Sequence, residues 1–153
     1  MDVRDTPEQA ELRRTARQLA RELGPRTVAD LDDGTRAKRL AVAVRDAGWL
    51  ELRHGGDSQD GTPFASGVEA AILADALGGS VADVAFAGPV LAADLARRAG
   101  ASPLDGAVVA FAPDLIEPAV VTGSATATPI YAVDGAAESQ TAAYVLVPAR
   151  DGY

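Results

Sequence analysis

The sequence contains no cysteine, a single histidine (His54) and few aromatic side chains, with three Phe, three Tyr and one Trp in 153 residues. Without cysteine the chain has no disulfide, no thiolate nucleophile and no zinc site built on thiolates. No apolar run approaches the ~18 residues that a membrane span needs, and the first residues lack the apolar core of a signal peptide. We therefore expect a cytoplasmic protein, with no membrane segment and no metal site.

Positive charge is also scarce. Lys and Arg number 14 against 22 Asp and Glu, Lys38 is the only lysine, and the net charge is −8. Because such a surface repels phosphate backbones and anionic lipids, we expect neither a nucleic acid nor a membrane as partner. Apolar residues make up 48% of the chain, which is enough for a globular core. Most of them are small, so the core is thin and partner surfaces are expected to complete it.

Four helices are predicted in the first part of the chain. Thr6-Pro7-Glu8-Gln9 has the pattern of a capping box, and Gly24 ends the helix that it starts. The arginines of this helix alternate with Glu8, Glu11 and Glu22, which favours a solvated basic face over the alternative of a phosphate site. The remaining helices follow Gly34 and end at Gly48, span about 66–77 and are apolar nearly all round, and run from near Pro89 to Gly100.

After residue 103 the pattern changes from helices to strands. The runs 107–112, 119–122, 130–133 and 143–147 are β-prone and are separated by Pro, Gly and Asp. Helices followed by strands indicate segregated elements and not an alternating parallel sheet. We therefore predict an α+β fold, with an all-helical amino-terminal bundle over 1–103 and a short, partial antiparallel β-domain over 104–153.

Two side chains invite a functional interpretation. A lone histidine beside Gly55-Gly56 is typical of a surface loop, although a small hydrolase using His54 and Asp57 is an alternative. No Gly-x-Ser-x-Gly elbow supports that alternative. We predict that Trp49 is a core anchor and not a stacking platform for a ligand.

The order of these elements resembles the amino-terminal part of the acyl-CoA dehydrogenase family. The opening helix around 11–17 is similar to the family's, and Gly48-Trp49 before Gly55-Gly56 resembles its Gly-Trp segment before a Gly-Gly loop. The helix end 73–78 is similar to the family's helix that ends in Leu-Gly, and 87–89 follows in the expected order. The resemblance covers roughly residues 8–112.

The resemblance implies FAD as cofactor and an acyl-CoA as substrate. In the family a loop after the first strand of the middle domain holds the flavin through a hydroxyl and a Glu, and both are missing here. The resemblance therefore implies only backbone contacts to the flavin, from Phe111 and Ala112. The family's catalytic base lies in a carboxy-terminal bundle with no counterpart in these residues, so we predict no catalytic residue in this chain.

The function implied is that of an acyl-CoA dehydrogenase-like protein or subunit that contributes to FAD-dependent α,β-dehydrogenation of an acyl-CoA thioester. Without the base it is not expected to be catalytic alone, so whether the chain is itself an enzyme stays open. The expected assembly is a homo- or hetero-oligomer with a dehydrogenase-like subunit. The alternative is a non-enzymatic helical module that presents an apolar face to a protein partner.

Overall fold

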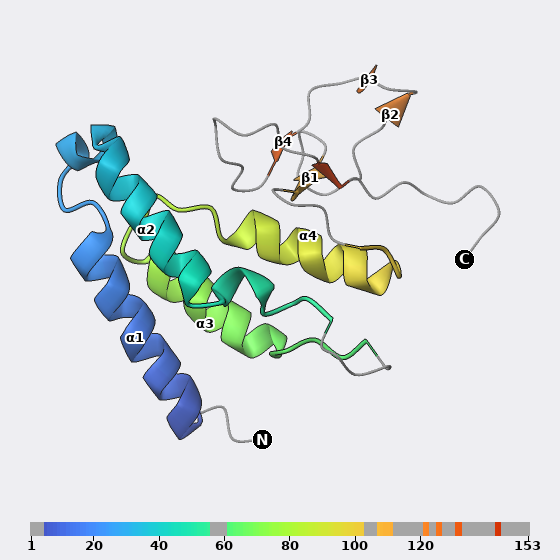
Figure 1. The fold of residues 1–153 in the computed structure, drawn as a ribbon, viewed down its shortest axis with the longest axis horizontal. Coiled ribbons are helices and arrows are strands. Elements are labelled where there is room, and N and C mark those ends of the chain that lie inside the picture. Colours follow the sequence, from blue (N-terminus) through green and yellow to red (C-terminus); the bar gives the residue numbers. More distant parts are fainter. Residues whose placement is uncertain are drawn as a thin grey trace. The chain divides into compact units, whose positions relative to one another are not determined.

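The computed structural model describes residues 5–55, 61–102 and 107–111 and the short strands at 121–122, 125–126, 131–132 and 143–144. The chain forms two compact units, Met1–Phe86 and Ala87–Tyr153. In the described part of the first unit all regular elements are helices, whereas the second combines a helix with short strands (Figure 1). Within the ranges described, no helix has the length and apolar character needed to cross a membrane.

The first unit contains the first three predicted α-helices. They are α1 (Pro7–Leu23), α2 (Gly34–Asp46) and α3 (Gly67–Gly78), with the 3-10 helices η1 (Val28–Asp32) before α2 and η2 (Trp49–Glu51) after it. α1 packs against both α2 and α3 (Figure 1). The helical half of the predicted fold class is therefore confirmed.

Local signals at the helix ends match the expected ones. The Thr6 hydroxyl accepts a bond from the Gln9 amide (3.2 Å), and the Gln9 side chain accepts one from the Thr6 amide (3.0 Å), which completes the capping box. At the other end of α1, a Cβ on Gly24 would lie 2.3 Å from the Ala20 carbonyl oxygen, so only glycine fits. Gly48 ends α2 with φ +69°, a conformation that favours glycine.

The core of the first unit is made of small side chains on α1 and larger ones on its neighbours. The fully buried residues of α1 are two alanines, Ala16 and Ala20. The other buried residues of this core are Leu40, Val44, Trp49, Ile72, Leu73, Ala76, Leu77 and Phe86. Trp49, 6% exposed, is the predicted core anchor. Leu12, Leu19 and Leu23 of α1 are half-buried, so these leucines also contribute apolar contact, while the small alanines let the helices approach closely.

The second unit pairs a helix with a strand. α4 (Ala87–Arg98) packs on β1 (Val108–Phe111), and Ala92 and Leu95 of the helix meet Ala107 and Val109. The remaining strands are two residues long: β2 (Val121–Thr122), β3 (Ala125–Thr126), β4 (Tyr131–Ala132) and β5 (Ala143–Tyr144). One sheet has the order β4-β1-β5, and β2 pairs antiparallel with β3.

The strands differ from the antiparallel β-domain that we predicted. β1 pairs antiparallel with β4 but parallel with β5, so this sheet is mixed. In the described residues the strands are also shorter than the β-prone runs, and they do not amount to a sheet domain. Periodicity gives the tendency to form a strand but not its partner or direction.

The division between the compact units lies before α4, whereas the predicted division between residues 103 and 104 followed the change in composition.

The turn after α3 places a valine where glycine is usual. The Ala82 amide bonds to the Leu77 carbonyl (3.0 Å) and the Val81 amide bonds to the Gly78 carbonyl (3.0 Å), which is the pattern of a Schellman motif. Val81 occupies its left-handed position with φ +51° and is 72% exposed. A β-branched residue in this conformation is strained by about 1–2 kcal/mol.

Replacing Val81 by glycine is expected to stabilise the protein. Val81→Gly removes the strain of the left-handed conformation, and after the added backbone entropy of glycine the net gain is about 1 kcal/mol. The midpoint of urea unfolding, at unchanged slope, measures it. The matched control is Ala82→Gly, next in the chain and outside the left-handed region, which should lower the free energy of unfolding. Equal losses in both variants would show that Val81 is not strained.

Candidate functional site

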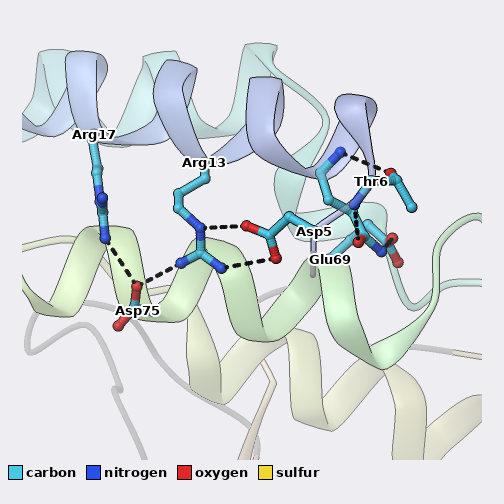
Figure 2. A network of polar contacts seen from close by, with 7 residues as sticks. Asp5, Thr6, Arg13, Arg17, Glu69 and Asp75 are labelled. Carbon is cyan, nitrogen blue, oxygen red and sulfur yellow. Dashed lines mark hydrogen bonds and ion pairs between the residues drawn. The ribbon is translucent and has the colours of Figure 1, made fainter. Parts of the chain in front are cut away.

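A network of hydrogen bonds and ion pairs lies along the contact between α1 and α3 (Figure 2). At one end, Gln9 Nε2 donates to Glu69 Oε1 (2.8 Å), although the two residues are 60 positions apart. Glu69 in turn belongs to the capping box of α3, where its carboxylate accepts bonds from the amide (2.9 Å) and hydroxyl of Ser66. A single hydrogen bond therefore joins the capping boxes of the two helices.

Further along the same seam, one carboxylate receives two arginines. Arg13 donates to Asp75 Oδ2 (2.8 Å) and to Asp5 Oδ2 (2.9 Å), and Arg17 reaches the same Asp75 oxygen at 3.5 Å (Figure 2). The basic residues of α1 are therefore not only a solvated face, as the sequence indicated, because Arg13 and Arg17 extend to α3. Arg14 keeps to the surface and pairs with Glu11 of its own helix.

Two carboxylates of this seam, those of Glu69 and Asp5, are held in their charged form. Hydrogen bonds from Gln9 and Ser66 lower the pKa of Glu69 from 4.5 to about 2. The hydrogen bond from Arg13 likewise lowers the pKa of Asp5. A carboxylate with so low a pKa is a poor general base near neutral pH, because catalytic bases are tuned toward the working pH. Glu69 is therefore suited to positioning the helices and not to acid–base chemistry.

The low pKa of Glu69 predicts a pH dependence of stability. A depressed pKa stabilises the fold above pH 4.5, and this contribution is lost as the pH falls through about 2. Glu69→Gln is expected to destabilise the protein by about 1 kcal/mol near neutral pH and to reduce the loss of stability between these values. Urea unfolding at a series of pH values measures both. Glu51→Gln, at an exposed carboxylate on η2, should leave the wild-type profile unchanged, and an identical profile for Glu69→Gln would contradict the assignment.

A second polar cluster is centred on Arg36 of α2, whose side chain is 13% exposed. Its guanidinium donates to the carbonyls of Leu23 (3.0 Å) and Asp30 (3.1 Å) and forms a two-pronged pair with Asp83. The pair lowers the pKa of Asp83 and raises that of Arg36. One side chain thus ties the end of α1, η1 and the segment after α3 to α2.

A charge-conserving change at Arg36 is expected to destabilise the fold. Lysine keeps the positive charge but cannot present the planar fork that pairs with Asp83 and reaches two carbonyls. Arg36→Lys should lower the free energy of unfolding by about 1–3 kcal/mol, measured from urea midpoints. Arg39→Lys, at an exposed position of the same helix, is the control and should change it by less than about 0.5 kcal/mol. Equal effects of the two changes would rule out a specific role of the Arg36 fork.

Of the two residues predicted to contact a flavin, the structure describes Phe111, at the end of β1. Phe111 is the last residue of the strand and is in register with Tyr131 of β4, whereas Ala112 lies outside the described residues. β1 runs between β4 and β5, so its backbone groups face neighbouring strands, and residues Val108–Phe111 have no polar side-chain atom. In the described part of this predicted contact, a hydrogen bond to a flavin would have to come from the backbone.

The structure assigns no chemistry to His54, which is half-buried. Its amide bonds to the Glu51 carbonyl (2.9 Å), and its carbonyl accepts from the Phe64 amide (3.3 Å). Asp57, the partner that a hydrolase would require, lies outside the described residues. Among the residues that are described, no group of His, Asp and Glu side chains has the arrangement of a metal site.

The residues that join the helices were not among those predicted from the sequence. Ser66 and Glu69 have the Ser-x-x-Glu spacing of a capping box, so this pair was open to prediction from local sequence. Arg36 and Asp83 are 47 positions apart and carry no local signal.

No protein-family model, no curated protein and no solved structure matches this chain.

Proposed function

We propose that this chain is a helical, pocket-forming portion of an acyl-CoA dehydrogenase-like flavoenzyme. It contributes to FAD-dependent α,β-dehydrogenation of an acyl-CoA thioester and is not catalytic alone. The observation that supports this most is the order of elements. Gly48 with its positive φ ends α2 and leads into buried Trp49, α3 ends at Gly78, and α4 is followed by strand β1. These are the positions that carry the sequence resemblance to the family.

The chemistry of the described residues supports a role that depends on a partner. Dehydrogenation of an acyl-CoA needs a carboxylate base at the α-carbon and a flavin that accepts the hydride. Glu69 and Asp5 are held ionised by their neighbours, and Asp75 is paired with two arginines. The base and the principal flavin contacts would come from outside these residues, in a homo- or hetero-oligomer with a dehydrogenase-like subunit. We propose that the assembly is cytoplasmic.

The purified chain is expected to bind no flavin by itself. Its absorbance between roughly 350 and 500 nm should show no stoichiometric flavin, and it should not dehydrogenate acyl-CoA substrates in the presence of an artificial electron acceptor. Stoichiometric flavin in the isolated chain would overturn the dependence on a partner.

Co-expression with the product of the neighbouring coding sequence tests the family assignment itself. A complex that retains flavin and oxidises an acyl-CoA would support it. A stable complex without flavin would contradict it and would favour the alternative function.

That alternative, a helical interaction module without enzymatic activity, is favoured by one observation. Several large apolar side chains are exposed in the described residues: Val28, Leu31, Val42, Phe64, Val68, Val81 and Leu91. Exposed apolar residues mark binding surfaces where they gather and not where they are scattered singly. Of these residues, Val42 lies in an open groove along α2.

A further inference from the structure

An open groove runs along α2 beside the end of α1. Its volume is about 440 Å³, and its lining consists of Leu23, Thr35, Lys38, Arg39, Val42, Ala43 and Asp46. All but Leu23 lie on α2, at spacings of three or four residues that place Thr35, Lys38, Val42 and Asp46 along one stripe of the helix. The groove therefore lies on the surface of α2 and runs parallel to the helix axis.

The floor of the groove is apolar and accessible. Val42 is 48% exposed, and Leu23 and Ala43 are half-buried beside it. Pockets for small molecules bury most of the ligand's surface, which a groove open to solvent does not do. A row of aliphatic side chains from a helix suits such a groove better, because it needs contact on one face only.

The charged groups on the rim favour an acidic occupant. The side chains of Lys38 and Arg39 form no ion pair or hydrogen bond in the part of the chain that the structure describes. Other arginines of the unit, such as Arg13, Arg17 and Arg36, already have carboxylate partners. Asp46, at the end of α2, is the one acidic residue of the lining, so the two cations outnumber the carboxylates there.

The larger hollow of this unit, about 500 Å³, is a weaker candidate. All of its lining residues belong to α1, so it is the space between long side chains and has no floor from a second element. Three of its arginines, Arg13, Arg14 and Arg17, are ion-paired.

We propose that the groove on α2 binds an acidic amphipathic helix of a protein partner. The apolar face of the partner helix packs on Leu23 and Val42, and its carboxylates pair with Lys38 and Arg39. Electrostatic complementarity of this kind determines which partner is accepted, and the apolar contact contributes most of the affinity. The inference does not depend on the proposed flavoenzyme, because it uses only the surface of the first unit.

The test uses the full chain and two synthetic helical peptides. Both have leucines at helical spacing on one face, and the other positions are Glu in the first peptide and Lys in the second. Fluorescence anisotropy measures the affinity of each labelled peptide. The protein variants are Val42→Asp, the double charge reversal Lys38→Glu and Arg39→Glu, and Leu91→Asp. Leu91 is the matched control because it lies on α4 and is 48% exposed, the same fraction as Val42. Circular dichroism verifies that each variant is folded.

The expected results are specific to the groove. The wild-type chain prefers the Glu peptide, Val42→Asp weakens that binding about tenfold or more, and Leu91→Asp leaves it unchanged. The double charge reversal shifts the preference to the Lys peptide. Equal affinity for the two peptides, equal effects of Val42→Asp and Leu91→Asp, or no binding of either peptide would overturn the proposal. Because the charge-reversed residues are on the rim, this variant remains informative even if Val42→Asp does not fold.

Discussion

The hydrogen bond between Gln9 and Glu69 is the interaction on which the packing of α1 depends most. The fully buried side chains of α1 are two alanines, its leucines Leu12, Leu19 and Leu23 are half-buried, and apolar contacts of this kind are not directional. Gln9 belongs to the capping box of α1 and Glu69 to that of α3, so their bond aligns the beginnings of the two helices. The pairing of Asp75 with Arg13 and Arg17 repeats the alignment farther along. Directional polar contacts thus add to apolar packing in specifying the register of α1 and α3.

The first unit also shows how an acidic chain can use its few cations. Arg36 lies where the end of α1, η1 and the segment after α3 meet, and its planar fork serves two carbonyls and the Asp83 carboxylate. A lysine has no equivalent geometry. The strong preference for arginine over lysine in the sequence is therefore compatible with a structural use of charge, at least at this position and at Arg13. Neither cluster has the properties of a catalytic centre.

Local sequence was sufficient to predict the helices but not their connections. The Thr6–Gln9 capping box, the glycines that end α1 and α2, and the burial of Trp49 all depend on neighbours in sequence, and the structure confirms them. The Gln9–Glu69 and Arg36–Asp83 contacts join residues 60 and 47 positions apart and leave no periodic signal. The pairing of β1 with β4 and β5 was equally inaccessible, because a strand of four residues does not specify its partners. At the candidate flavin site, the described part of β1 offers only backbone groups, and Ala112 lies outside the described residues.

Lys38 gives the groove on α2 a chemical property that no other part of this sequence shares. It carries the only lysine ε-amino group among the 153 residues. A lysine-directed modification of these residues can therefore occur at one side chain only, on the rim of the groove. This holds for an acetyl group, a conjugated protein or an amine-reactive dye. Acetylation there would remove one of the two rim cations without touching the apolar floor. A single enzymatic or chemical step could thus change the electrostatics of this surface while leaving the interior of the helical unit as it is.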